Sequence, residues 1–392
     1  MAIRDLNLPH HPADPTPGPF RQFVVKIHGR CDLACDYCYV YEHADQSWRH
    51  RPPVMPVHVS AQLAGRIAQH VRRHRLAAVR VILHGGEPLL AGVDGIARVV
   101  DGVQAAVDGE AEVSFAIQTN GVRLDHTFLR YFRERRIQVG VSLDGGLAAH
   151  NRHRRFAHGG SSFPQVVAAL DLLRSAAYRE VYGGILGTID LRNDPLDVYH
   201  GLLGFDPPLI DLRPPHGNWV TPPPGRTPGG TATPYADWLI AVFDEWYGAG
   251  VRATGVRLFD SIIQMVLGGP SDTEDVGLTR TGAVVIDTDG SIQASDVLKT
   301  TRPGEPETGL NVLTHTFDDA LAAPAILAEQ RSAATVPVQC RRCEIVALCG
   351  GGLRAHRFHP TAGFDQRSVY CPDLLRLIPY IRDRVRADLA AT

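Results

Sequence analysis

The sequence predicts an α/β protein built as a partial (β/α)6 barrel with a smaller C-terminal extension. The main observation is that short β-branched runs alternate six times with helical patterns, which is typical of parallel strands joined by crossover helices. A doubly wound sheet is the competing architecture for this alternation. The second observation is the composition: 392 residues, 44% hydrophobic, with a formal net charge of −2. Such a chain can bury a large core, and its charge argues against a strongly basic nucleic-acid surface.

The elements of the barrel follow from hydrophobic periodicity. The strands are runs of apolar and β-branched residues, whereas the helices carry apolar residues every three or four positions. Predicted strands cover residues 23–28, 79–83, 113–118, 138–143, 181–189 and 209–213. Predicted helices cover residues 60–73, 95–107, 125–135, 163–177 and 196–203.

The second half of the chain has a different pattern. Residues 213–234 are rich in proline and glycine, which indicates either a plain connector or an ordered loop near the substrate. Helices are expected at 235–247, 256–267 and 374–389, and a hairpin is expected around Thr288-Asp289-Gly290. We therefore predict a tail (1–20), a barrel (21–225), a helical connector (226–275) and a C-terminal domain (276–392). The tail lacks the apolar core of a signal peptide, and we expect a cytoplasmic protein that does not bind membranes.

Seven cysteines stand in two groups, and their odd number argues against a purely paired disulfide framework. Cys31, Cys35 and Cys38 directly follow the first predicted strand. Three thiolates on one loop can hold a soft metal centre and leave one coordination position open for chemistry. The alternative is a zinc site completed by His28 or His43.

Polar, glycine-containing turns follow the next three predicted strands. They are Gly85-Gly86-Glu87-Pro88, Thr119-Asn120-Gly121 and Ser142-Leu143-Asp144-Gly145. In a parallel β/α barrel the carboxyl ends of the strands share one rim, where the active site lies. We therefore expect these turns and the cysteine loop to meet at one site.

The spacing Cys31-x3-Cys35-x2-Cys38, with Tyr37 before the third cysteine, resembles the signature of radical S-adenosylmethionine (SAM) enzymes. The resemblance implies that the three cysteines hold a [4Fe-4S] cluster whose fourth iron chelates SAM. Reduction by an external electron donor would then release a 5′-deoxyadenosyl radical. It also implies that Gly85, Gly86 and Glu87 bind the SAM amine and that Asn120 and Ser142 contact the ribose or carboxylate. Arg154 would pair with the SAM carboxylate, with Arg152 and Arg155 as competing choices.

The second group, Cys340, Cys343, Cys349 and Cys371, supplies enough thiolates for a structural zinc or a fully ligated [4Fe-4S] cluster. It resembles the C-terminal extension of SPASM-type radical SAM maturases, which implies one auxiliary [4Fe-4S] cluster. Ser295 and Leu353 stand where that pattern needs further cysteines, so we expect two clusters in total. Asp296 is a candidate proton acceptor by the same resemblance, although it could also be a hairpin-end residue facing water.

Local text narrows the resemblance to FxsB-type maturases. It includes Cys38-Tyr39-Val40-Tyr41-Glu42-His43 and Pro215-His216-Gly217-Asn218-Trp219. The implied activity joins an aromatic ring to the Cβ of the residue two positions later in a ribosomal precursor peptide, with Asp296 or His216 as base. Alternatives are another SPASM-type maturase, forming thioethers or formylglycine, and a non-catalytic zinc or iron–sulfur protein. We expect no nucleic-acid partner.

Overall fold

The computed structural model describes residues 18–280, 282–330 and 335–391. The predicted tail (1–20) therefore lies outside the described residues except for its last three positions. Within the described part of the chain, no helix combines the length and apolar character needed to cross a membrane.

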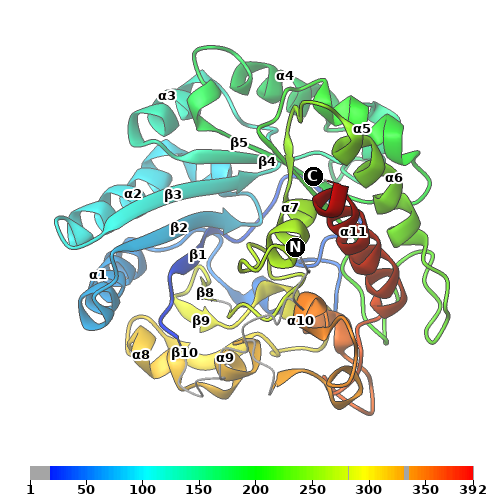
Figure 1. Cartoon of the computed structure of the whole chain (residues 1–392). Coiled ribbons are helices and arrows are strands. Elements are labelled where there is room, and N and C mark those ends of the chain that lie inside the picture. Colours follow the sequence, from blue (N-terminus) through cyan, green and yellow to red (C-terminus); the bar gives the residue numbers. More distant parts are fainter. Residues whose placement is uncertain (1–17, 281, 331–334, 392) are drawn as a thin grey trace.

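The parallel strands form a partial barrel, as predicted. β1 pairs with β2, and each following strand pairs in parallel with the next as far as β7, while β1 and β6 are not neighbours in the sheet. The barrel is therefore open between its first and sixth strands (Figure 1). The strands are β1 (Gln22–His28), β2 (Ala78–Gly85), β3 (Glu112–Thr119), β4 (Gln138–Ser142), β5 (Tyr182–Thr188), β6 (Leu209–Arg213) and β7 (Gly255–Val256).

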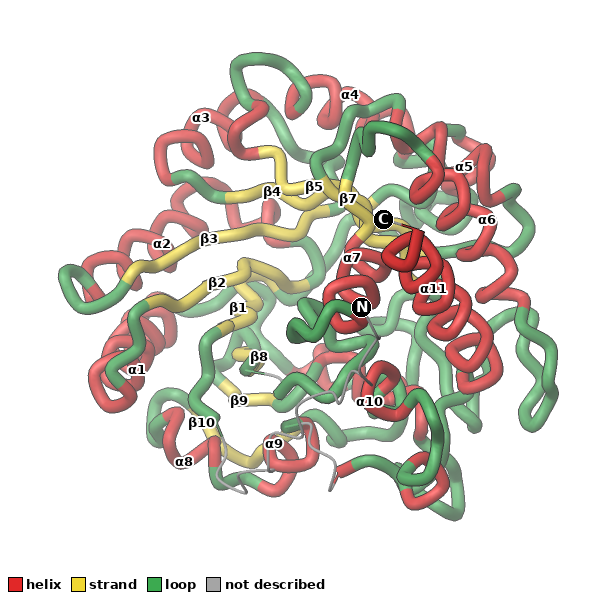
Figure 2. The backbone as a smooth tube through the Cα atoms, in the orientation of Figure 1, coloured by secondary structure: helices red, strands yellow, loops and turns green. Residues whose placement is uncertain are grey.

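The crossover helices cover the outer face of these strands (Figure 2). Each helix buries one apolar stripe; in α1 this stripe includes Leu63, Ile67 and Val71. Asp125 and Asp194 cap two of the helices by accepting backbone N–H groups, which satisfies donors that have no partner within the helix. The helices are α1 (Val57–His74), α2 (Gly92–Val107), α3 (His126–Arg135), α4 (Phe163–Leu173) and α5 (Pro195–Leu203).

The predicted hairpin does not stand apart from the barrel. β8 (Ala283–Ile286) pairs in parallel with β1, and β9 (Ser291–Gln293) pairs antiparallel with β8 and with β10 (Glu307–Asn311). One ten-stranded sheet therefore runs from β10 through β1 to β7. The sequence patterns missed β10 because its residues alternate between half-buried and exposed without a continuous apolar face.

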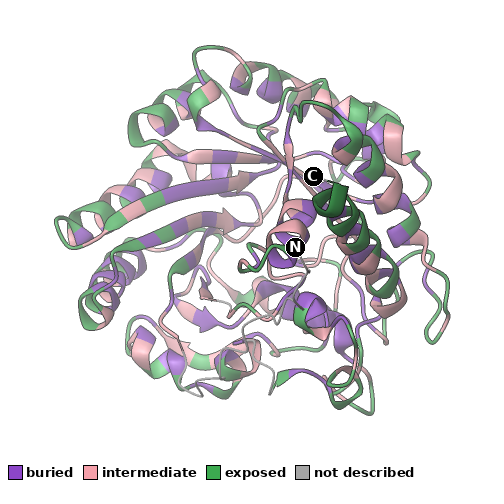
Figure 3. Cartoon of the chain, viewed as in Figure 1, coloured by how far each residue is buried: buried purple, intermediate pink, exposed green. Residues whose placement is uncertain are grey.

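The remaining helices close the molecule on the open side of the barrel. α11 packs against α6 and α7, as Figure 1 shows, and it runs through Pro379 without ending. Buried side chains concentrate along the strands and on the inner faces of the helices (Figure 3). These helices are α6 (Pro234–Gly248), α7 (Arg257–Val266), α8 (Phe317–Leu321), α9 (Pro324–Glu329), α10 (Val346–Cys349) and α11 (Cys371–Ala391).

Candidate functional site

The three-cysteine loop leaves the carboxyl end of β1 and folds back on itself. The backbone N–H of Cys38 donates to the carbonyl of Cys35 at 3.1 Å, and the side-chain amide of Asn120 donates to Cys31 Sγ at 3.6 Å. Burial raises the pKa of Cys31 to about 12 and the pKa of Cys35 to about 11. The free thiols are therefore protonated at neutral pH, and a metal centre must displace these protons to bind.

Gly85 and Gly86 let the end of β2 press directly against this loop. A Cβ atom on Gly85 would lie 2.1 Å from the carbonyl oxygen of His28, and one on Gly86 would lie 2.5 Å from the backbone of Arg30. Gly85 also has a φ of +145°, which side chains rarely adopt. The glycines are thus required for packing within the chain; their contact with a ligand stays a prediction.

Glu87 organises the neighbouring turn after β3. Its carboxylate accepts from the N–H of Leu89 at 2.9 Å, the hydroxyl of Thr119 at 2.7 Å and the N–H of Asn120 at 2.7 Å. Asn120 in turn donates to Asp32 Oδ1 at 2.8 Å. The two predicted site residues are therefore coupled, and Glu87 acts on the loop through Asn120.

Arg154 reaches the cysteine loop through Tyr37. Its Nη1 donates to the Tyr37 hydroxyl oxygen at 3.0 Å, and that hydroxyl donates to Asp144 Oδ2 at 2.7 Å. Arg154 is buried, and its Nε has no hydrogen-bond partner among the described atoms. A buried, unsatisfied cation beside Cys35 is suited to an anionic ligand at this loop.

The neighbouring arginines have other roles. Arg152 pairs with Asp190 and donates to Asn193 Oδ1 at 2.8 Å, while Arg155 is exposed and donates to backbone carbonyls of its own loop. The structure therefore favours Arg154 among the three, a choice that sequence spacing left open. Ser142 lies at the end of β4, where its hydroxyl accepts from Gln118 at 3.0 Å.

Asp296 lies at the start of a 3-10 helix, Asp296–Thr300, just after β9. Its Oδ1 pairs with the ammonium of Lys26 at 2.5 Å, whereas its Oδ2 is buried and no described atom hydrogen-bonds to it. The alternative of a hairpin-end carboxylate facing water is wrong, because Asp296 is only 7% exposed. The sheet continuing from β1 into β8 and β9 carries it into the interior.

His216 lies between the two cysteine groups. Its ring contacts Tyr39, next to Cys38, and its Nδ1 is 3.0 Å from Nε2 of His356. His356 contacts the ring of Tyr370, which directly precedes Cys371. Burial and the neighbouring His356 lower the pKa of His216 well below its usual range, so its imidazole is neutral and a weak base.

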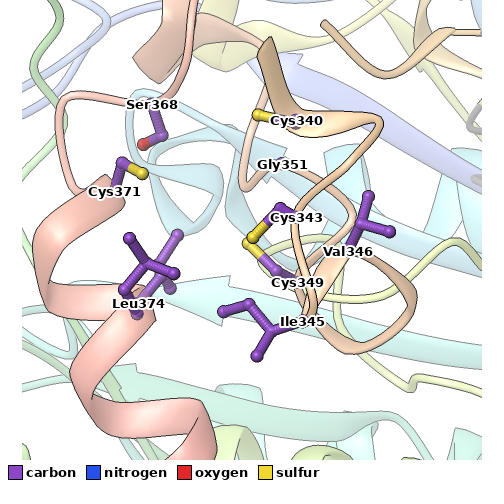
Figure 4. A pocket seen from close by; sticks show the side chains of 10 residues that line it. Cys340, Cys343, Ile345, Val346, Cys349, Gly351, Ser368, Cys371 and Leu374 are labelled. Carbon is purple, nitrogen blue, oxygen red and sulfur yellow. The ribbon is translucent and has the colours of Figure 1, made fainter. Parts of the chain in front are cut away.

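The four remaining cysteines line one pocket between the loop around α10 and the first turn of α11. Figure 4 shows their sulfur atoms pointing into a common space. The rest of the lining is mostly apolar and includes Ile345, Val346 and Leu374. Burial raises the pKa of Cys349 to about 12. All seven cysteines lie in the described residues, and none forms a disulfide.

Both cysteine sets fit metal centres that use thiolate ligands. In the first set, an amide donor and an unsatisfied guanidinium nitrogen stand beside three thiols that have no fourth cysteine partner nearby in the chain. In the second, four thiols converge on one cavity. Leu353 is buried and Ser295 precedes Asp296, so neither position supplies a further thiolate.

A third cluster of ligand-type residues has a structural explanation. Ligand atoms of His70, His74 and Asp318 lie within 4.8 Å of one another. His70 Nε2 accepts the N–H of Phe20 at 3.0 Å, so a neutral ring carries its proton on Nδ1, 3.3 Å from Asp318. Burial, and then the neighbouring His74, lowers the pKa of His70 to about 4. The cluster ties the chain before β1 to α1 and α8.

Residues 25–199 match the Radical SAM superfamily. This segment is a radical SAM domain. Such domains use a [4Fe-4S] cluster and SAM as cofactors. The match covers β1 to α5, including the cysteine loop and the three rim turns.

Comparisons over the whole chain point to maturases within this superfamily. A serine-type anaerobic sulfatase-maturating enzyme of Bacteroides thetaiotaomicron is 24% identical over 88% of this chain and 84% of its own length. A cysteine-type enzyme of Clostridium perfringens is 23% identical over 94% and 97%. The structure of native anSMEcpe with bound AdoMet aligns with a TM-score of 0.79 at 21% identity, covering 93% of this chain and 98% of that one. Streptococcus suis SuiB bound to its precursor peptide SuiA aligns at a TM-score of 0.58 and 12% identity, covering 90% and 76%. The likeness to these solved structures establishes the shared fold.

Proposed function

We propose that this protein is a radical SAM maturase that removes a Cβ hydrogen from one residue of a peptide or protein and releases a product oxidised by two electrons. The observation that carries the proposal is the arrangement of the barrel rim: three thiols, the Asn120 amide and the Arg154 guanidinium face one site. A buried carboxylate oxygen with no partner in the described chain, Asp296 Oδ2, lies in the same interior.

In this proposal Cys31, Cys35 and Cys38 hold the [4Fe-4S] cluster, and the rim residues bind SAM. When bound, the cluster and SAM together supply a hydrogen-abstracting radical after reduction by an external electron donor. Arg154, held in place by Tyr37 and Asp144, pairs with the SAM carboxylate. The buried surroundings of the loop exclude water, which protects a reactive species from side reactions.

The substrate must next lose one proton and one electron. Asp296 Oδ2 takes the proton, because it is the free acceptor of a buried carboxylate. His216 is the weaker candidate, since burial lowers its pKa. Cys340, Cys343, Cys349 and Cys371 hold an auxiliary [4Fe-4S] cluster that accepts the electron.

The comparisons support oxidation of a serine or cysteine side chain to formylglycine as the product. The relatives with the most extensive alignments are serine-type and cysteine-type anaerobic sulfatase-maturating enzymes. A solved structure of one such enzyme holds AdoMet together with a peptide, and it aligns over 93% of this chain. In this reaction the heteroatom on the same side chain takes up the oxidation.

A second candidate product is a cyclophane crosslink in a ribosomal precursor peptide. Two observations favour it: the FxsB-like text around residues 38–45 and 215–219, and Ser295 and Leu353 at positions where other SPASM-type maturases carry cysteines. Here the Cβ radical adds to an aromatic ring of the substrate, and loss of a proton and an electron restores aromaticity. Asp296 and the four-cysteine site would serve both reactions in the same way.

The test is anaerobic reconstitution followed by incubation with two peptide pools. One pool contains Ser and Cys but no aromatic residues, and the other contains aromatic-x-x segments but neither Ser nor Cys. Formylglycine formation gives a product in the first pool that reacts with a hydrazide probe. Cyclophane formation gives loss of two hydrogens in the second pool, with no aldehyde and with fragmentation blocked between the joined residues. An iron-loaded protein that does not cleave SAM would refute both.

A further inference from the structure

The chain contains only two lysines among its 40 basic residues, and both are buried in one cluster. Lys26 on β1 is 3% exposed and Lys299 is fully buried. Arginine is used at all other basic positions, including the exposed ones. Because a lysine is rarely buried unless it is paired, two buried lysines in one place indicate a specific local requirement.

The cluster alternates in charge. Lys26 Nζ lies 2.5 Å from Asp296 Oδ1 and 3.4 Å from Asp287 Oδ2, and Arg51 Nη1 lies 2.8 Å from Asp287 Oδ2. Lys299 Nζ lies 3.5 Å from Asp45 Oδ1 and 4.0 Å from Asp287 Oδ2. The three inner cations therefore face three inner carboxylates: Lys26, Lys299 and Arg51 against Asp45, Asp287 and Asp296.

The two lysines have different neighbours. Burial lowers the pKa of Lys26, but Asp296 and Asp287 outweigh it, so the pKa of Lys26 is raised and this side chain stays cationic. Burial and the nearby Lys26 lower the pKa of Lys299. Lys26 is thus the cation that contacts the candidate base, whereas Lys299 contacts Asp45 and Asp287.

Lys26 leaves one carboxylate oxygen free. It binds Oδ1 of Asp296, while Oδ2 is buried without a hydrogen-bond partner in the described residues. His84, the register partner of Lys26 on β2, has a buried and unpartnered Nδ1 in the same part of the barrel. An arginine fork would occupy several acceptors at once, whereas the compact ammonium holds a single oxygen.

We propose that Lys26 is a positioning residue that keeps Asp296 ionised and turns its free Oδ2 toward the substrate. This inference rests on the proposed function, in which Oδ2 takes the proton that the substrate loses. The proton passes from the substrate to Oδ2 and later to solvent, and Lys26 itself is neither oxidised nor deprotonated. Removing Lys26 would leave a buried, unpaired carboxylate, which favours the neutral acid and the loss of this geometry.

The test compares Lys26→Met with Lys299→Met, which removes the other buried lysine of the same cluster without removing a contact to Asp296. Asp296→Asn and the double variant Lys26→Met/Asp296→Asn complete a cycle. Each reconstituted protein is assayed for 5′-deoxyadenosine, for modified peptide and for its urea unfolding curve. If Lys26→Met does not fold, Lys26→Gln, which keeps a neutral donor, takes its place.

We expect Lys26→Met to retain SAM cleavage and to lower modified peptide per SAM cleaved by about tenfold or more. Asp296→Asn should add little to this loss in the double variant, and it should stabilise the Lys26→Met protein although it destabilises the wild type. Lys299→Met should lower stability while leaving the ratio within about twofold. Equal losses of the ratio in both lysine variants, or additive losses in the double variant, would overturn the proposal. The unfolding cycle reports on the pair even if the wild type modifies no peptide, so failure of the proposed function is seen separately.

Discussion

The two cysteine sites of this protein are built from opposite surroundings. The three-cysteine loop is ringed by polar side chains: Asn120 donates to Cys31, and Arg154, Tyr37 and Asp144 form a buried chain beside Cys35. The four-cysteine pocket is lined mainly by Ile345, Val346, Leu374 and Leu375, with Ser368 as its polar side chain other than the thiols. Thiol count and surroundings therefore change together.

This difference has a physical meaning. A site with an open coordination position needs donors and cations around it to orient a polar ligand, and the barrel rim supplies them from four strand ends. A site closed by four thiolates needs no ligand contacts, and an apolar wall limits solvent access and tunes its potential. The contrast indicates chemistry at the first site and electron storage at the second.

The strongest way to break the comparison is to remove the first site. Replacing Cys31, Cys35 and Cys38 by Ala should reduce SAM cleavage to the background rate, because no thiolate remains to hold the reactive cluster. Iron content should fall from about eight to about four per chain. Iron analysis and 5′-deoxyadenosine quantification check this, and unchanged iron content would contradict the assignment.

Removing the second site should separate SAM cleavage from product formation. In Cys340→Ala/Cys371→Ala, we expect about four irons per chain and retained SAM cleavage, with modified peptide reduced by about tenfold or more. Ser368→Ala, in the same pocket, serves as the control and should keep about eight irons. Loss of SAM cleavage in the double variant would show that the two sites are not independent.

Arg154 sharpens the description of the first site. Arg154→Met should weaken SAM binding by roughly 10–100-fold, because a charge-assisted hydrogen bond to a carboxylate is lost. Equilibrium dialysis with labelled SAM measures this directly. Arg155→Met, an exposed change on the same loop, should leave the affinity unaltered. Equal effects of both changes would mean that Arg154 acts only through the fold.

The smallest expected effect concerns His216, which lies between the two sites. Burial and His356 lower its pKa well below the usual value of about 6.5, so it remains neutral from pH 6 upward. His216→Asn should therefore leave the pH dependence of modified peptide per SAM cleaved unchanged between about pH 6 and 9. Disappearance of an acid limb in this variant would make His216, not Asp296, the proton acceptor.

Much of this arrangement could be predicted from local sequence. The barrel strands were identified to within a few residues because apolar periodicity is a local property, and the rim turns follow because parallel strands end on one side. Helix 163–177 was predicted too long; α4 ends at Leu173 and the chain turns before β5. β10, α8 and α9 are too short or too irregular to give a clear pattern.

The sequence by itself determined the grouping of the cysteines, the strand–helix order and the polar turns at the rim. Only the tertiary structure decided which arginine reaches the cysteine loop, that β8 joins β1, and that Asp296 is buried. It also brought Lys26 to Asp296 across 270 residues of chain. The reason is that periodicity and spacing act within an element, whereas the environment of a charge depends on segments that meet only after folding.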